Sequence, residues 1–294
     1  MPPLSCIVVF DISTYIHRAF HSLPIEKFKR SKDNLATNAV YGTTKMLINT
    51  LQNIKWEYNS IYPIVCFDTA KSKLFRTSID SSYKSQRPSA PSELKHQFQW
   101  IRSLIISMKL PHIEIPSFEA DDLIASIVYK YKDQQNTDII IVSNDKDMNQ
   151  LLIQDNIKIF NPTIKSTINS NDIFEKYKVI PSHFTLYQAL VGDKIDNIKG
   201  IKGIGAKTAP SIISSCNGDI SNLPISHPKY NIIHSNLECL QNSLQLVTLN
   251  SSIPINLPQL TPFNIKQINN SEFKNFMNEL EFFSIVKQFC KNFS

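Results

Sequence analysis

The segment "HIEIPSFEADDLIASIVYKYKDQQNTDIIIVSNDKD" (residues 112–147) predicts a strand, a helix and a second strand. A helical pattern over about 120–132 lies between the two apolar runs, and acidic residues follow each run. A strand, a helix and another strand in succession are typical of a unit whose two strands are parallel. The segment therefore predicts an α/β fold with a parallel sheet.

The same pattern extends in both directions along the chain. "CIVVFD" (6–11) and "IYPIVCFD" (61–68) are short apolar runs that end in aspartate, and "NIKIFNP" (156–162) predicts a fifth strand. Helical patterns over about 38–54 and 93–109 lie between them. Because the carboxyl ends of parallel strands meet at one edge, where open α/β sheets bind ligands, we expect the acids to gather there.

The acidic motifs predict a metal site. So many carboxylates cannot all stay ionised close together without cations, and divalent ions with oxygen ligands are their natural partners. Two Mg²⁺ or Mn²⁺ ions about 4 Å apart could activate a water and stabilise the leaving oxygen in phosphodiester hydrolysis. For a single motif, helix caps and loop acids remain an alternative. The candidate ligands are Asp11, Asp68, Glu119, Asp121, Asp122, Asp145, Asp147, Asp193 and Asp196.

The helical spacing within the motif "FEADD" distinguishes its acids as metal ligands. Glu119 and Asp122 are three residues apart and share a helical face, whereas Asp121 is turned away from Glu119. All three bind one ion only if Glu119 still belongs to the preceding loop. We therefore expect Asp121 to be a ligand and Asp122 to be an outer contact.

Past residue 165 the pattern changes to short helices, which are expected over 171–178, 181–191, 206–215 and 232–249. The proline-spaced stretch 251–264 predicts a surface connector, and a helix is expected near 271–291. We therefore predict an α/β core over 1–165, a helical region over 166–260 and a C-terminal helical segment over 261–294.

The segment "GIKGIGAKTA" (200–209) predicts a turn that holds a phosphate. It is not a nucleotide-binding P-loop, because Ala206 separates the glycine and lysine that the motif needs side by side, and no strand precedes it. A helix, a glycine turn and a second helix fit better, with backbone N–H groups and a helix N-terminus near 206 facing a phosphate. An ordinary helix connector remains an alternative. The candidate contacts are Gly200, Lys202, Gly203, Gly205, Lys207 and Thr208.

Composition is consistent with a polyanionic partner. Nine of the 25 acidic residues belong to the acidic motifs, which leaves 16 against 31 lysines and arginines in a chain of net charge +6. The five cysteines are scattered without metal-binding spacing, which indicates reduced thiols. No apolar run could span a membrane and no signal peptide is evident, so we expect a cytoplasmic protein. An organellar protein remains an alternative.

Taken together, the motifs resemble the 5′ nuclease superfamily, which includes flap endonucleases and the 5′–3′ exonuclease domain of bacterial DNA polymerase I. The resemblance covers most of the chain in order. The matching stretches are "FDISTYIHRAFHSLP", "TNAVYGTTKMLINTL", "CFDTAKSKLFRTSIDSSYKSQRPSAPSEL", "FEADDLIAS", "SNDKDMNQLL", "GDKIDNIKGIKGIGAKTA" and "LEFFSI". The first of them resembles the family's first strand and the loop after it.

The resemblance implies a PIN-like fold, a helix–three-turn–helix element that binds duplex DNA, and two divalent metals. It implies cleavage of DNA near a single-strand/double-strand junction at a 5′ end, in primer removal and repair, with a K⁺ ion at the 200–205 hairpin. The first metal would be held by Asp11, Asp68, Glu119 and Asp121, with Asp122 nearby. The second would be held by Asp145, Asp147, Asp193 and Asp196.

By the same resemblance, segment 69–92 is the arch that grips a single strand. Its basic residues, interleaved with Phe75 and Tyr83, suit a strand whose bases stack while its phosphates follow the charges. Lys84 and Arg87 would reach the scissile phosphate and stabilise developing charge. The further basic residues are Lys71 and Lys73, with Arg18 and Arg76 as additional phosphate contacts.

Two positions depart from the family pattern. Ile12 stands where the family has glycine, which raises the question of whether the backbone there needs a positive φ, and Lys199 stands where proline is frequent. A DNA-binding protein that has lost catalysis and a PIN-type ribonuclease are the alternative functions. A HAD-type phosphatase would need aspartate where Ser13 stands. We expect a monomer that works beside a separately encoded polymerase.

Overall fold

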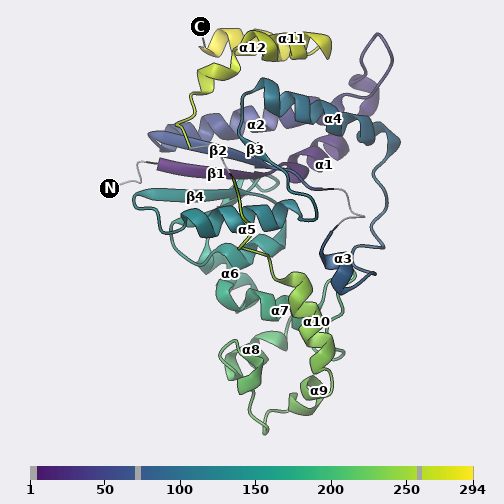
Figure 1. Cartoon of the computed structure of the whole chain (residues 1–294), viewed down its shortest axis with the longest axis vertical. Coiled ribbons are helices and arrows are strands. Elements are labelled where there is room, and N and C mark those ends of the chain that lie inside the picture. Colours follow the sequence, from purple (N-terminus) through teal and green to yellow (C-terminus); the bar gives the residue numbers. More distant parts are fainter. Residues whose placement is uncertain (1–4, 70–73, 257–259, 294) are drawn as a thin grey trace.

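A six-stranded sheet lies at the centre of the molecule. The structure is a computed structural model that describes residues 5–69, 74–256 and 260–293, with side chains up to residue 288. The strand order is β3-β2-β1-β4-β5-β6; the first five strands are parallel and β6 is antiparallel to β5 (Figure 1). The sheet confirms the predicted α/β class. The strands are β1 (Ser5–Asp11), β2 (Ser60–Cys66), β3 (His112–Ile113), β4 (Thr137–Val142), β5 (Ile157–Asn161) and β6 (Ser166–Ile168).

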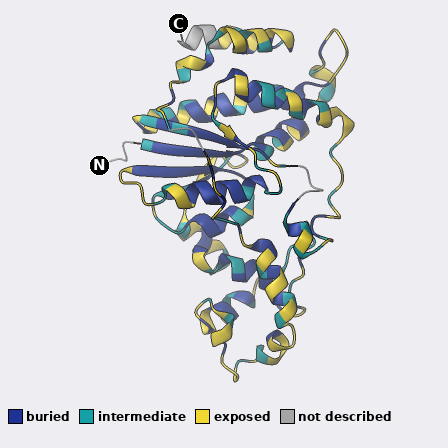
Figure 2. Cartoon of the chain, viewed as in Figure 1, coloured by how far each residue is buried: buried dark blue, intermediate teal, exposed yellow. Residues whose placement is uncertain are grey.

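Helices cover both faces of this sheet because successive strand residues point to opposite sides. Ile7 and Val9 face a core on the side of α5 (Ala120–Tyr131), whereas Val8 and Phe10 face a second core. The second core is covered by α1 (Ile12–Ser22), α2 (Asn38–Glu57) and α4 (Ser92–Ser107). The central strands are almost entirely buried, as their continuous apolar runs require (Figure 2).

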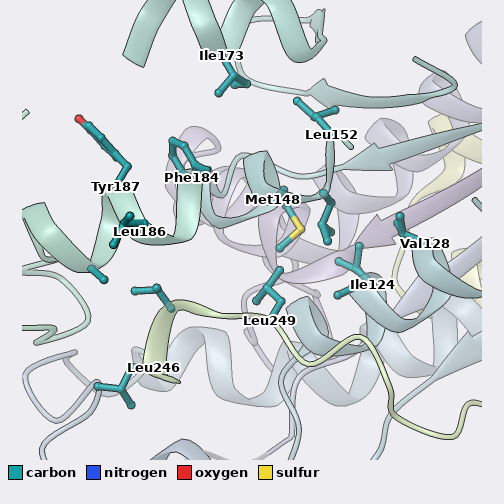
Figure 3. Close-up of a cluster of buried hydrophobic side chains, with 14 of the residues drawn as sticks. Ile124, Val128, Met148, Leu152, Ile173, Phe184, Leu186, Tyr187, Leu246 and Leu249 are labelled. Atoms are coloured by element: carbon teal, nitrogen blue, oxygen red, sulfur yellow. The ribbon is translucent and has the colours of Figure 1, made fainter. Parts of the chain in front are cut away.

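The helices after the sheet extend the core on the α5 side. Ile173, Phe184 and Leu246 pack with Met148 and Ile124 in one continuous cluster (Figure 3). The predicted boundary near 165 falls inside the β5–β6 hairpin, so the sheet continues to Ile168. These helices are α6 (Ser170–Tyr177), α7 (Phe184–Val191), α8 (Ala209–Ser215), α9 (Tyr230–His234) and α10 (Leu237–Val247).

The C-terminal segment returns to the face covered by α2 and α4. Helices α11 (Ser271–Glu279) and α12 (Phe283–Phe293) lie on that side in Figure 1, and Phe273 and Met277 are buried in the second core. No helix among the described residues is both long and apolar enough to cross a membrane.

Several elements differ from the sequence prediction. The segment after Asp11, expected as a loop, is helix α1, because the Asp11 carboxylate caps it by accepting from Thr14 N. Ile12 is therefore helical and fully buried, and this position needs no positive φ. The predicted strand at 112–122 spans only two residues, and helix 206–215 starts at Ala209.

The last long helices are each divided in two. The predicted helix 232–249 is interrupted between α9 and α10, and the predicted helix near 271–291 is interrupted between α11 and α12. The remaining short elements are α3 (Arg76–Ile79), η1 (Ile25–Lys27), η3 (Lys146–Leu151), η4 (Pro181–His183), η5 (Ile220–Asn222) and η6 (Ile265–Ile268).

Candidate active site

Acidic residues from four parallel strands meet at the carboxyl edge of the sheet. Asp11 ends β1, which lies between β2 and β4, and Asp68 comes two residues after β2. Glu119 caps α5 after β3, and Asp145 caps η3 after β4. The strand order reverses direction at β1, which is where open α/β sheets form their ligand crevice.

Hydroxyl and amide groups hold the first two carboxylates in place. Thr14 Oγ1 and Ser143 Oγ donate to Asp11 Oδ2 at 2.6 and 2.8 Å. The backbone N–H of Ala120, at the start of α5, donates to Asp68 Oδ1 at 2.9 Å. Burial, followed by the neighbouring charge of Asp68, raises the pKa of Asp11 to about 6. The two carboxylates therefore repel each other in a setting that a bound cation would relieve.

Three more aspartates share this electrostatic condition. Burial raises the pKa of Asp121 well above its ordinary value, and the charges of Asp145 and Asp11 add to this effect. Burial raises the pKa of Asp145, and burial together with Asp145 raises the pKa of Asp147 to about 7. A buried cluster of carboxylates that raise one another's pKa values, with only oxygen donors, has the chemistry that a hard divalent cation prefers.

Glu119 lies against cations from the arch. Lys84 Nζ donates to Glu119 Oε1, while Arg76 Nη1 and the Tyr83 hydroxyl each donate to Oε2 at 3.0 Å. Although burial opposes it, the neighbouring Lys84 and Arg76 lower the pKa of Glu119. Although burial opposes it, Glu119 together with Tyr83, Asp121 and Asp196 raises the pKa of Lys84. Lys84 also has a left-handed backbone, with φ 53°.

Arg76 is a correction to the sequence analysis. It was expected to contact a phosphate, but it is only 1% exposed, and its guanidinium forms a two-pronged pair with Asp122 at 2.7 Å for both bonds. It also donates to the carbonyls of Leu246 and Thr248, at the end of α10. Arg76 therefore ties the arch to α5 and α10.

Asp122 is corrected by the same contact. Its carboxylate is fully buried, and it accepts from Arg76 and from the backbone N–H of Asn250 at 2.9 Å. With no exposed surface and a two-pronged bond to Arg76, Asp122 acts as a structural anion rather than as a metal ligand. The helical spacing that set Asp121 apart from Asp122 indicated this difference.

The loop after α7 supplies two carboxylates that are already paired. Arg87 Nε donates to Asp196 Oδ1 at 2.8 Å, and Lys84 Nζ lies 3.7 Å from Asp196 Oδ2. Lys146 Nζ lies 2.8 Å from Asp193 Oδ2, and although burial opposes it, this pair lowers the pKa of Asp193. Among the described residues, no three acidic, histidine or cysteine side chains are grouped tightly enough to hold one metal ion. The two ligand sets therefore remain a proposal.

Sequence reasoning missed several residues of this site. Lys146 lies inside the quoted motif "SNDKD" and was not singled out, and Gln188 of α7 donates to Asp147 Oδ1. Thr14 and Ser143 hold Asp11, and Tyr83 was considered only as a stacking residue. The neutral side chains among them carry little signal in one sequence, because they act through the residue they contact.

The glycines of the 200–205 hairpin have two different environments: one is closely packed and two are open to solvent. A Cβ at Gly200 would lie 2.3 Å from the Val191 carbonyl oxygen, so this glycine serves chain packing rather than the expected approach of a phosphate. Gly203 has φ +85°, and a Cβ at Gly203 or Gly205 would meet nothing within 4 Å. Lys202 is exposed beside them. The open part of the hairpin is therefore 202–207.

The remaining predicted DNA contacts that the structure describes are exposed or half-buried. Lys207 is exposed, and Thr208 Oγ1 accepts from Gly205 N at 2.9 Å. Arg18 is half-buried and donates to Thr163 Oγ1 at 2.8 Å. The arch lysines Lys71 and Lys73 lie outside the described residues.

Two family models match the chain. The 5′-3′ exonuclease N-terminal resolvase-like domain matches residues 6–178, and the 5′-3′ exonuclease C-terminal SAM fold matches residues 179–271. The chain belongs to the 5′–3′ exonuclease family. This confirms the resemblance drawn from the motifs, as well as the resolvase-like core followed by a helical region.

Individual relatives agree with this membership. A 5′-3′ exonuclease of Aquifex aeolicus is 33% identical over 292 residues, which cover 99% of this chain and 97% of that protein. A DNA polymerase I of Caldicellulosiruptor bescii is 31% identical over 302 residues, and the match covers 96% of this exonuclease-family chain but only 33% of the polymerase.

A solved structure shows the same fold. The bacteriophage T5 flap endonuclease, in a pseudo-enzyme–product complex with DNA and metal ions, aligns with a TM-score of 0.64 at 19% identity. The alignment covers 94% of this chain and 99% of the T5 chain.

Proposed function

We propose that this chain is a divalent-metal-dependent 5′ nuclease. It hydrolyses phosphodiester bonds of DNA, or of an RNA primer paired to DNA, at a 5′ end or at a single-strand/double-strand junction. The observation that carries the proposal is the acidic edge of the sheet, where Asp11, Asp68, Asp121 and Asp145 gather from four strands in a chain of this family.

The acidic edge fits two Mg²⁺ or Mn²⁺ ions. Its carboxylates are oxygen donors, and burial together with neighbouring carboxylates raises the pKa values of Asp11 and Asp147, an effect that bound cations would relieve. Bound there, the ions would activate a water and stabilise the leaving oxygen. One ion would be held by Asp11, Asp68, Glu119 and Asp121, and the other by Asp145, Asp147, Asp193 and Asp196.

Lys84 and Arg87 complete the proposed chemistry. Both cations already lie within the carboxylate cluster, paired with Glu119 and Asp196. An incoming phosphate would compete for these ammonium and guanidinium groups, which would then stabilise the charge that develops on the phosphate oxygens. The arch thus positions its cations before the substrate arrives.

The 202–207 hairpin supports binding of the duplex. Its backbone N–H groups at Lys202, Gly203, Ala206 and Lys207 have no acceptor within the described part of the chain. Such groups hold phosphates without reading bases. A K⁺ ion at 200–205 and a phosphate contact by Arg18 belong to the same proposal.

A labelled 5′-flap DNA tests the function. We expect cleavage near the junction with Mg²⁺, no cleavage with EDTA, and loss of cleavage in Asp68→Ala with retained DNA binding. Intact flap and nicked duplex across Mg²⁺ and Mn²⁺ concentrations would favour a DNA-binding protein without catalysis. The sequence departure that suggested such decay was Ile12, which is an ordinary buried helical residue here.

The setting of the reaction is proposed from the relatives. The match to one third of a DNA polymerase I suggests that this nuclease removes primers beside a polymerase. A cytoplasmic location and a monomeric state remain predictions.

A further inference from the structure

A cavity of about 290 Å³ opens beside the acidic edge. It lies between η3, the β5–β6 hairpin and α6, and Ser143 and Asp145 form one of its walls. Its size is at the lower end of small-molecule pockets, roughly 300 Å³ and upward. None of the proposed catalytic cations of the arch lines it.

Asn149 is the most informative residue in this cavity. It is only 5% exposed, and its carboxamide has no hydrogen-bond partner among the described residues, although it lines the cavity. The amide opens to the cavity, so its donor and acceptor are available to a molecule bound there. A ligand that accepts and donates hydrogen bonds would supply the missing partners.

The other walls provide a mixed surface. Asn161 Oδ1 accepts from the N–H groups of Thr163 and Ile164 at 2.9 and 3.2 Å, which leaves its amide NH₂ available. Ile159, Ile173 and the half-buried ring of Tyr177 add apolar area. Amide groups together with apolar and aromatic walls match the hydrogen-bonding edge and the apolar faces of a nucleobase.

Charge around the cavity is distributed unevenly. Asp172 is used by the α6 cap, where it accepts from Asn169 N at 2.7 Å, and Lys146 is paired with Asp193. Lys176 is exposed and has no acidic partner within the described residues; its Nζ lies 5.0 Å from the Tyr177 ring centroid. One free cation at the rim suits one phosphate.

We propose that this cavity binds a nucleoside 5′-monophosphate, with the base near Asn149 and Asn161 and the phosphate near Lys176. The identity of the ligand as a product of strand degradation rests on the proposed nuclease function. Retention of this product beside Asp145 would delay the next turnover, so the cavity would make the enzyme sensitive to its own product.

Calorimetric titration of the full chain in EDTA tests binding without cleavage. We expect saturable one-to-one binding of a deoxynucleoside monophosphate, at least tenfold weaker in Asn149→Ala. Lys176→Ala should weaken the monophosphate about tenfold and leave the deoxynucleoside unaffected. Lys95→Ala, an exposed lysine of α4 on the other face of the sheet, is the matched control and should bind normally.

Three results would overturn the proposal. They are no saturable binding in the millimolar range, equal binding of inorganic phosphate, or binding only of an oligonucleotide. If Asn149→Ala fails to fold, as judged by circular dichroism, the Lys176→Ala variant provides the test. An unchanged affinity of Lys176→Ala for the monophosphate would contradict the proposal. Flap cleavage is assayed separately. An enzyme that cleaves flap DNA but does not bind monophosphates would refute the proposed ligand of the cavity and leave the proposed nuclease function intact.

Discussion

Lys84 donates its backbone N–H to the carbonyl oxygen of Asp196 at 3.0 Å, while its side chain lies 3.7 Å from the Asp196 carboxylate. Two residues more than a hundred positions apart are thus joined through both backbone and side chain. The bond fixes the arch to the loop after α7, and the carboxamide of Asn197 strengthens it by donating to the Ser82 carbonyl at 3.0 Å. The cation and the carboxylate that serve the proposed reaction are therefore positioned as one unit.

We expect Lys84→Ala to lower kcat on 5′-flap DNA by on the order of 10²–10³, because one charge-stabilising group is lost. The dissociation constant for flap DNA should change by less than about tenfold, since the backbone bond to Asp196 is retained. Single-turnover cleavage and fluorescence anisotropy measure the two quantities. The control variant Arg102→Ala, which removes the ion pair with Glu114, should leave both quantities unchanged. If Lys84→Ala weakens DNA binding but leaves kcat unchanged, the proposed role of Lys84 in stabilising charge is contradicted.

Replacing Arg76 should lower the free energy of unfolding of the protein. Its guanidinium is the main partner of the fully buried Asp122, and breaking a buried pair on one side costs about 3–5 kcal/mol because a charge is left uncompensated. We expect this loss for Arg76→Met in urea unfolding. Arg76→Lys should recover only part of it, since an ammonium cannot reproduce the two-pronged bond.

Asp122 provides the internal check for that experiment. In the double variant Arg76→Met with Asp122→Leu the free energy of unfolding should largely recover, because the buried pair is removed as a whole while Glu119 keeps its pair with Lys84. Arg30→Ala serves as a second comparison, since its partners Asp33 and Glu279 are more exposed. A small loss in Arg76→Met, within about 1 kcal/mol, would show that the site is solvated in solution.

The raised pKa values of Asp11 and Asp147, about 6 and about 7 against an ordinary 3.8, predict a dependence of metal-free stability on pH. The folded chain binds these protons more tightly than the unfolded chain, so the stabilisation is complete below pH 3.8 and is lost as pH rises through 6 to 7. Between pH 5.5 and 8 in EDTA, we expect the free energy of unfolding to fall by about 2–3 kcal/mol.

Chemical unfolding at several pH values measures this change, and two comparisons isolate its cause. Asp147→Asn should remove roughly 2 kcal/mol of the fall, because the asparagine does not titrate. Mg²⁺ should raise Tm more at pH 8 than at pH 5.5, since protons and metal compete for the same oxygens. A metal-free stability that rises over this range contradicts the electrostatic description of the site.

The sequence was sufficient for the sheet and for the position of its acids, because buried parallel strands are continuous apolar runs and their ends are marked by aspartate. It was insufficient for Arg76, whose basic neighbours in the arch suggested a solvent-facing role. The partner that buries Arg76, Asp122, lies 46 positions away, and its carbonyl acceptors at Leu246 and Thr248 are farther still. Such pairings depend on how α3, α5 and α10 pack, which one sequence does not specify.

Helix α1 was missed for a related reason. Ile12 follows an apolar strand directly, and the motif resemblance suggested a loop, but Asp11 acts as a helix cap while it also faces the other acids. One side chain thus has two roles at a strand–helix junction. A local sequence pattern can indicate either a helix cap or a member of an acidic site, but it cannot show that one aspartate serves as both.

Two glycines of the hairpin should respond oppositely to an added methyl group. Gly200→Ala places a Cβ 2.3 Å from the Val191 carbonyl oxygen, and because both groups belong to the backbone, we expect a loss of about 1–3 kcal/mol or more. Gly205→Ala meets nothing within 4 Å and needs no positive φ, so its Tm should stay within about 2 °C of the parent. If phosphates approach this turn, Gly205→Ala should still weaken binding of duplex DNA severalfold at low salt. Thermal unfolding and anisotropy titrations separate these effects, and a Gly205→Ala protein with unchanged DNA affinity at every salt concentration would place the duplex elsewhere.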